Sequence, residues 1–256
     1  SEIKLHCNTI VPIAARDGQG LVKPSSKMPW YSGPTFIETL DNIPQPNSPN
    51  ELPTRLPIQD IYKFDERRII AGRIESGTLK INDTLLFSPS NKRAAVASFE
   101  TWNTKEKKTQ ALAGESVAIV LDEEIFIERG HVASLAHNAP IETNVFRGKV
   151  FWVGEKPMNT GDRLKMKIGT AEHAVEIEAV ESIIDVSNLK TTNSDLIERN
   201  DIGEAIFRTK STIALDSFET NHRTGRFVLV DGYETVGGGV VSMHGYPDQR
   251  GLYDVT

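Results

Sequence analysis

The chain has 256 residues, of which 38% are hydrophobic and 25% charged, a composition typical of a folded globular protein. Its 29 basic and 35 acidic residues give a net charge of −6, which weighs against general nucleic-acid binding because phosphate neutralisation needs a basic surface. No apolar run approaches the roughly 20 residues that span a bilayer, no secretory signal opens the sequence, and the single cysteine, Cys7, excludes an internal disulfide. We therefore expect a cytoplasmic protein without membrane contact.

The first 43 residues predict the end of a larger α/β unit. The apolar run Asn8–Ala14 is typical of a buried strand and leads into a loop with two glycines. Thr35 is expected to cap a helix, with Glu38 three residues later completing a capping box, and apolar residues follow at helical spacing. One strand, one loop and one short helix cannot enclose a core. Residues 1–43 are therefore interpreted as the last part of a domain whose body lies outside this chain.

Residues 44–53 contain four prolines and are predicted to form a stiff linker, because proline fixes the backbone and removes hydrogen-bond donors. Beyond the linker, short runs rich in Val, Ile and Phe alternate with turn residues. This pattern predicts a small antiparallel barrel over residues 54–140. The strands expected in it are Leu56–Phe64, Arg68–Ile74, Thr84–Ser88, Arg93–Thr101, Ser116–Leu121 and His131–Leu135.

A second all-β unit is expected over residues 141–243, followed by a tail or cut linker over residues 244–256. The predicted fold class is therefore mainly β, with two consecutive antiparallel barrels after a short α/β remnant. The strands expected in the second barrel are Asn144–Val153, Leu164–Ile168, Glu172–Asp185, Glu204–Leu215, Arg226–Val230 and Thr235–Met243.

No self-contained active site is visible in these residues. The chain lacks the G-x-x-x-x-G-K-[ST] loop that surrounds a triphosphate with backbone amides, and Asp17–Gly20, which matches D-x-x-G, is better interpreted as an ordinary loop. The six histidines show no metal-ligand spacing. Gly237–Gly239 lies between valines without a following helix, so it predicts a bulge or a close backbone contact within a strand.

Several longer segments, in order, resemble domain II of translational GTPases such as elongation factor Tu. Within that superfamily, the chain is most similar to the large, GTP-binding subunit of sulfate adenylyltransferase. The resemblance covers about residues 8–243 and is specific only in aggregate. The segments that carry it include Leu56–Tyr62, Tyr62–Arg73, Ala71–Gly77, Leu79–Asp83, Leu86–Lys92, Ala113–Val117, Ile127–Val132, Val150–Gly154, Lys167–Glu172 and Gly225–Asp231.

The same resemblance implies a role for the loop that follows the first apolar run. Residues 12–16 are similar to the last guanine-contacting loop of a GTPase domain, in which the backbone N–H at the position of Ala15 approaches the guanine O6. Arg16 falls where the family often has a long side chain beside the base. Ala14 replaces the family's serine, so a hydroxyl contact there is lost. The guanine-binding remnant is thus Ala14, Ala15 and Arg16, with no catalytic or metal-binding residue.

The resemblance implies a regulatory GTPase subunit that couples GTP hydrolysis to adenylyl sulfate synthesis by a separate small catalytic subunit. GTP and Mg²⁺ are expected only for the full-length parent, whose N-terminal GTPase domain would lie upstream, and this chain alone is expected to be inactive. An adenylylsulfate kinase module, present in some relatives, could follow the tail. The alternatives are an elongation-factor module that binds aminoacyl-tRNA, disfavoured by the charge of −6, and a plain interaction domain without any nucleotide link.

Overall fold

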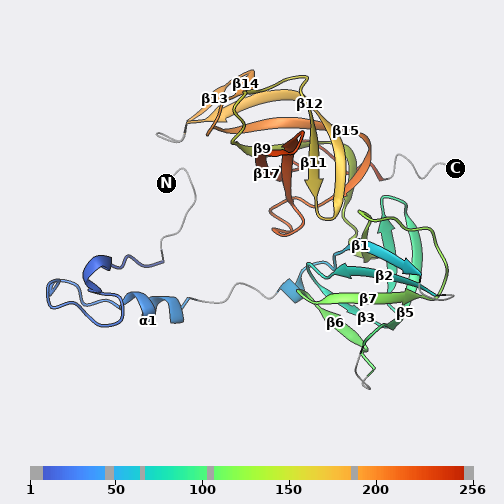
Figure 1. The fold of residues 1–256 in the computed structure, drawn as a ribbon, viewed down its shortest axis with the longest axis horizontal. Coiled ribbons are helices and arrows are strands. Elements are labelled where there is room, and N and C mark those ends of the chain that lie inside the picture. Colours follow the sequence, from blue (N-terminus) through green and yellow to red (C-terminus); the bar gives the residue numbers. More distant parts are fainter. Residues whose placement is uncertain (1–7, 44–48, 64–66, 103–106, 186–189, 251–256) are drawn as a thin grey trace. The chain divides into compact units, whose positions relative to one another are not determined.

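A computed structural model describes residues 8–43, 49–63, 67–102, 107–185, 190–250 of the chain (Figure 1). The chain divides into two compact units, residues 1–48 and residues 49–256. Within these bounds the strands are all antiparallel and far outnumber the helices. The mainly β fold class expected from the pattern of short apolar runs is confirmed.

In residues 8–43, the described part of the first unit, the helical elements are the turn η1 (Ala15–Asp17) and the short helix α1 (Phe36–Asp41). The expected capping box is present, because the Thr35 side chain accepts from the Glu38 N–H and the Glu38 carboxylate accepts from the Thr35 N–H. The expected buried strand over Asn8–Ala14 is wrong. Apart from a bridge between Ala14 and Gln19, residues 8–14 form no strand pairing, and the Ile10 side chain is 79% exposed. A strand needs a neighbour to satisfy its backbone groups, and the described part of this unit offers none.

The second unit begins with a closed six-stranded barrel in the order β1-β2-β7-β5-β4-β8. A separate ribbon of β3 and β6 lies beside it. The barrel is closed by the pairing of β1 with β8, at Leu56 and Pro57. The strands are β1 (Leu56–Lys63), β2 (Arg68–Arg73), β3 (Thr78–Lys80), β4 (Thr84–Ser88), β5 (Lys92–Phe99), β6 (Gln110–Leu112), β7 (Ser116–Leu121) and β8 (Val132–Leu135).

Alternating apolar side chains fill the interior of this barrel, among them Leu85, Phe87 and Ile119, all with no exposed surface. Gly72 on β2 allows the strands to cross closely. A Cβ built on Gly72 would lie 2.5 Å from the Pro57 carbonyl oxygen, so a residue with a side chain does not fit at this position.

A short turn, η3 (Ala136–Asn138), leads to the second barrel. Its sheet has the order β11-β16-β17-β9-β15-β12-β13, and the pairing of β11 with β12 closes six of these strands into a ring. The strands are β9 (Ile141–Trp152), β10 (Met158–Asn159), β11 (Arg163–Ile168), β12 (Ala171–Ile184), β13 (Thr191–Asn193), β14 (Leu196–Ile197), β15 (Ile202–Leu215), β16 (Arg226–Asp231) and β17 (Glu234–Ser242).

Three phenylalanines form the centre of the second core. The rings of Phe146, Phe207 and Phe227 come from β9, β15 and β16, and their centroids lie 5.2–5.6 Å apart in stacked and edge-on contacts. All twelve long strands expected from the sequence are present within a few residues of their predicted bounds. The two- and three-residue strands β3, β6, β10, β13 and β14 were not anticipated, because so few residues leave no readable alternation.

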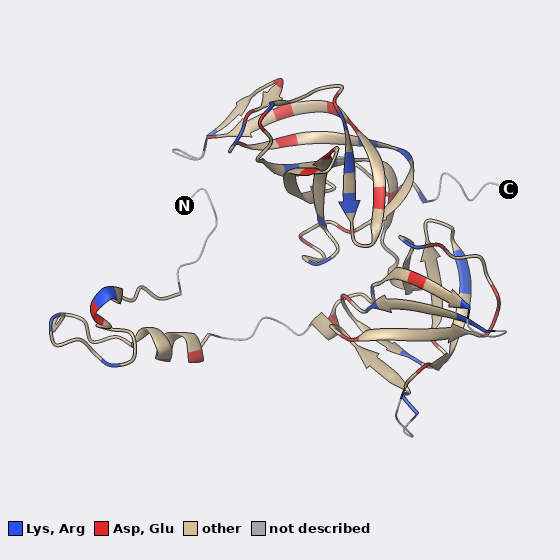
Figure 2. Cartoon of the chain, viewed as in Figure 1, with Lys and Arg blue, Asp and Glu red and all other residues tan. Residues whose placement is uncertain are grey.

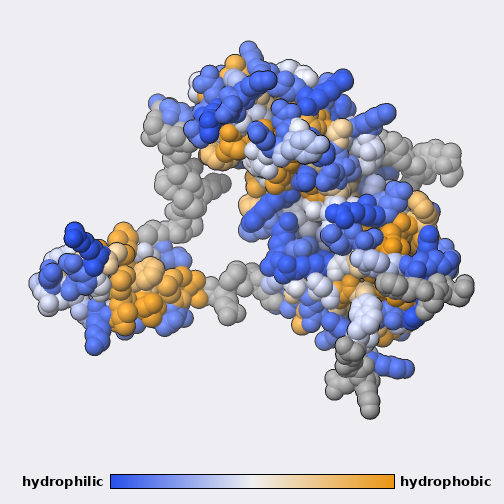
Figure 3. All heavy atoms as spheres, in the orientation of Figure 1, coloured by the Kyte–Doolittle hydropathy of each residue, from blue (hydrophilic) through white to orange (hydrophobic). Residues whose placement is uncertain are grey.

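Basic and acidic residues both occur along the strands of the two barrels (Figure 2). The surface of the first unit is different, since apolar side chains gather around α1 (Figure 3). Trp30 is 71% exposed, and Phe36, Ile37 and Leu40 are each about 40% exposed or more. Among the described residues, no helix has the length and apolar character needed to cross a membrane.

Candidate functional site

The loop predicted to contact guanine is a tight turn held by its own backbone. Ala14 and Gln19 exchange two backbone hydrogen bonds of 3.0 and 3.2 Å, and the Asp17 N–H donates to the Ala14 carbonyl at 3.1 Å. Gly18 follows at φ 68°, in the left-handed region where glycine is favoured. Ala15 and Arg16 are therefore presented on the exposed outside of the turn.

The turn is anchored to the start of α1. The N–H groups of Phe36 and Ile37 donate to the carbonyls of Gly20 and Leu21, each at 3.0 Å. Gly20 also packs against the preceding chain, because a Cβ there would lie 2.6 Å from the Pro12 carbonyl oxygen. These contacts fix the turn relative to the helix without any hydrophobic core.

What the turn offers chemically is a pair of outward backbone donors. In the described residues, the Ala15 and Arg16 N–H groups meet no acceptor, whereas those of Ala14, Asp17, Gly18 and Gln19 are all hydrogen-bonded. A carbonyl oxygen such as the guanine O6 is a suitable acceptor for such donors. The structure thus brings the predicted residues Ala14, Ala15 and Arg16 together in one turn, and their role toward guanine stays a prediction.

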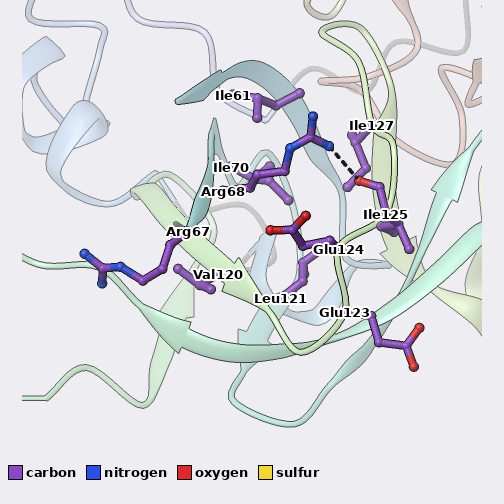
Figure 4. A pocket seen from close by; sticks show the side chains of 10 residues that line it. All are labelled: Ile61, Arg67, Arg68, Ile70, Val120, Leu121, Glu123, Glu124, Ile125 and Ile127. Carbon is purple, nitrogen blue, oxygen red and sulfur yellow. Dashed lines mark hydrogen bonds between the residues drawn. The ribbon is translucent and has the colours of Figure 1, made fainter. Parts of the chain in front are cut away.

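A separate cavity opens on the first barrel between β1, β2, β7 and the loop that follows β7 (Figure 4). Its volume is about 160 Å³. Most of its lining is aliphatic, and the Arg68 guanidinium spans it by donating to the Ile125 carbonyl at 3.3 Å. The charged groups Arg67, Glu123 and Glu124 lie around it, and the other lining residues are Ile61, Ile70, Val120, Leu121 and Ile127. The lining contains no serine, cysteine or histidine, and its aliphatic side chains can accommodate an apolar group.

The junction of the two barrels contains a buried ion pair. The Arg55 Nη2 lies 2.8 Å from the Asp216 Oδ1, and the two side chains are only 3% and 5% exposed. The second Asp216 oxygen accepts from Arg55 Nε at 2.9 Å and from the Thr224 hydroxyl, and Arg55 Nη1 donates to the carbonyls of Thr54 and Asn138. The charges are thus paired and hydrogen-bonded on all sides, which is what burial of an ion pair requires.

Two further contacts join the barrels near this ion pair. The Asn221 side-chain amide donates to the buried Ser76 hydroxyl at 2.8 Å, and the Thr170 hydroxyl donates to the Ile58 carbonyl at 2.7 Å. Gly130 faces Ala171 so closely that a Cβ on the glycine would lie 3.0 Å from the alanine Cβ. These hydrogen bonds and this close approach show that the two barrels make specific contacts at their junction.

A cleft of about 520 Å³ lies along the same junction and contains two histidines. Burial lowers the pKa of His131, although Glu128, 3.9 Å away, acts in the opposite direction and Lys92 assists the lowering. Burial alone lowers the pKa of His173. No group of three metal-ligating side chains occurs among the residues placed by the structure.

Sequence reasoning missed the junction residues. Arg55 and Asp216 are separated by 161 positions, and no local motif marks either one. The sequence gives one indirect indication of the pair. Asp216 directly follows an apolar strand, and a carboxylate buried there needs a partner because an unpaired buried charge is costly. By contrast, the close backbone contact expected within Gly237–Gly239 is present at Gly239, where a Cβ would lie 2.6 Å from the Lys149 carbonyl oxygen.

Comparisons with known proteins agree with this architecture. A family model described as GTP-eEF1A C-terminal domain-like matches residues 145–242. Subunit 1 of sulfate adenylyltransferase from Vibrio campbellii is 31% identical over 251 residues, which cover 96% of this chain and 52% of that protein. Elongation factor 1-alpha from Sulfolobus acidocaldarius is 32% identical over 237 residues, covering 90% of this chain and 54% of that protein.

Among solved structures, Sup35 complexed with GDP is similar, with a TM-score of 0.70 at 25% identity, and the match covers 90% of this chain and 57% of that one. Sup35 complexed with GMPPNP gives a TM-score of 0.69. The chain spans about half the length of the curated relatives it matches.

Proposed function

We propose that this chain, which is similar to subunit 1 of sulfate adenylyltransferase and to elongation factor 1-alpha, is the β-barrel region of a sulfate adenylyltransferase GTPase subunit. In the parent protein, GTP hydrolysis would drive adenylyl sulfate synthesis by a separate small catalytic subunit in sulfate assimilation. The two barrels would form the platform that docks this subunit and responds to the bound nucleotide.

The observation that carries the proposal is the extent of the similarity to subunit 1. An alignment that covers 96% of the chain includes residues on both sides of 44–48, and so takes in the turn at Ala14–Gln19 as well as both barrels. A resemblance confined to the barrels would suit any protein with this fold.

We keep the domain assignment as part of the proposal. Residues 1–43 are assigned to the end of the GTPase domain, 44–53 to a linker, 54–140 and 141–243 to the two barrels, and 244–256 to a tail or cut linker. The linker residues 44–48 and the tail residues 251–256 lie outside the part of the chain that the structure describes. The barrel assignment is supported by the run of strands from Leu56 to Ser242.

The experiment that tests the proposal is capture of a sulfate adenylyltransferase small subunit by the purified chain. We expect the purified chain to retain the small subunit and the bare resin to retain none. Failure of the chain to retain the small subunit, in a preparation that gives a cooperative thermal transition, would contradict the proposal.

The alternative hypothesis, an elongation-factor module, makes a different prediction. Such a module would bind aminoacyl-tRNA with an affinity that falls steeply as the salt concentration rises. The similarity to elongation factor 1-alpha keeps this alternative open, whereas the net charge of −6 opposes it. We expect no salt-sensitive retention of aminoacyl-tRNA on filters.

GTP and Mg²⁺ are assigned to the full-length parent and not to this chain alone. The turn at Ala14–Gln19 supplies at most two backbone donors toward guanine, and the sequence contains no phosphate-binding loop. We therefore expect no measurable heat in a calorimetric titration of this chain with GTP. Micromolar affinity, about −8 kcal/mol, would show that the chain contains its own nucleotide site.

A further inference from the structure

The segment that follows β17 is not a free tail. Residues 244–250 run along the first half of β9, and the His244 carbonyl accepts from the Arg147 guanidinium in the middle of that strand at 2.9 Å. The same guanidinium lies over the Tyr246 ring, 5.6 Å from its centroid. The first half of the segment is therefore held against the outer side of β9.

The second half pairs with the backbone of the first residues of β9. The Glu142 N–H donates to the Asp248 carboxylate at 3.0 Å, and the Gln249 N–H donates to the Glu142 carbonyl at 2.7 Å. The Asn144 N–H donates to the Gln249 side chain at 3.2 Å. Three backbone groups of the chain that enters the second barrel are thus satisfied by this segment.

Arg250 ends the segment at the junction with the first barrel. Its Nη2 donates to the Ser88 hydroxyl on β4 at 3.2 Å and to the Pro140 carbonyl, and lies 3.2 Å from the Glu142 carboxylate. The other Glu142 oxygen accepts from the Asn91 amide of the first barrel at 3.0 Å. The seat of the guanidinium is therefore built by both barrels.

The buried polar atoms around the Arg250 guanidinium have fewer hydrogen-bond partners than those of the Arg55–Asp216 pair. Glu142 is only 2% exposed, yet its Oε1 has no aligned hydrogen bond despite the nearby guanidinium. The Arg250 Nε and the Asn91 Oδ1 are also buried without a hydrogen-bond partner. Buried polar atoms without partners weaken a closed state. Such a contact can open at a lower cost than the fully bonded pair beside it.

We propose that residues 244–250 form a releasable strap across the barrel junction and that Arg250 is its latch. When the latch is closed, Arg250 neutralises the buried Glu142 and holds β4, the connection at Pro140 and the start of β9 together. When it opens, Glu142 is left without its countercharge, and the strap no longer pairs with β9. The strap thereby couples the C-terminal end of the chain to the junction of the two barrels.

The test is hydrogen exchange measured on the whole chain, comparing Arg250→Gln with the wild type. The reporting amides are those of Glu142 and Asn144, which donate to the strap. We expect both to exchange at least ten times faster in the variant, while the Val150 amide near the far end of β9 is unchanged. Arg163→Gln, which removes an exposed arginine of the second barrel, is the matched control and is expected to change neither reporter.

A second variant keeps the proposal testable if Arg250→Gln does not fold. Asp248→Asn weakens the strap without removing the countercharge of Glu142, and should accelerate the same two amides. Adding Glu142→Gln to Arg250→Gln should restore thermal stability while leaving the amides fast, because the buried charge is gone but the strap stays open. Unchanged exchange at Glu142 and Asn144 in a folded variant would overturn the proposal.

Discussion

At the scale of single residues, burial decides which charges matter. Most ion pairs of the second barrel are exposed, such as Arg163 with Glu176, whose side chains are 82% and 47% exposed. Solvent screens such pairs, and they contribute little to stability. The Arg55–Asp216 pair is almost fully removed from water and joins the two barrels, so each partner depends on the other.

This difference predicts the effect of removing one partner. Arg55→Leu leaves Asp216 as a buried carboxylate without a countercharge, and we expect a loss of about 3–5 kcal/mol in the free energy of unfolding. Arg163→Leu should cost less than about 1 kcal/mol. Urea titration followed by circular dichroism measures both. Equal losses for the two variants would show that the junction pair does not stabilise the fold.

At the scale of elements, the strands follow from the alternation of apolar and polar residues wherever that alternation is long enough. It also failed once, at Asn8–Ala14, where an apolar run forms no strand because it has no neighbour in the described residues. On β17, by contrast, glycines stand where neighbouring groups leave no room. The Phe227 ring and the Lys149 carbonyl both approach Gly239, whereas only the Phe227 carbonyl, 3.9 Å away, comes near the position of a Cβ on Gly238.

The neighbouring glycines therefore provide a matched pair of substitutions. Gly239→Ala would bring its Cβ within 2.6 Å of the Lys149 carbonyl oxygen, and we expect a loss of roughly 1–3 kcal/mol or a failure to fold. Gly238→Ala should be tolerated. Thermal unfolding of the two purified variants distinguishes them, and a lower melting temperature for Gly238→Ala than for Gly239→Ala would contradict the packing argument.

At the scale of the whole molecule, the junction between the barrels carries the features that neither barrel has alone. Two histidines lie in its cleft, beside Glu128, Arg129 and Glu172. Because burial lowers the pKa of both His131 and His173, the folded state takes up protons less readily than the unfolded chain. In the interval where the unfolded chain binds more protons, stability rises with pH.

The sign predicts a loss of stability as the pH falls from about 7 through the ordinary histidine value near 6.5. Hydrogen bonds from Lys108 and Lys167 lower the pKa values of Glu115 and Glu172. These two carboxylates add to the loss of stability only at more acidic pH, below their ordinary value near 4.5, because they stay charged in the folded state above it. We expect the double variant His131→Gln, His173→Gln to show a smaller decrease in melting temperature between pH 7 and pH 5.5 than the wild type. Parallel curves for the two proteins would exclude the histidines as the cause.

The sequence by itself determined the two barrels, because alternation along a strand records which side chains face a core, and it determined the capping box at Thr35 because that contact spans only three residues. Tertiary structure decided the junction. The Arg55–Asp216 pair, the seat of Arg250 and the cleft with its histidines unite residues up to 162 positions apart. Such contacts depend on how the two barrels pack against each other, and the spacing of residues within one segment does not encode that packing.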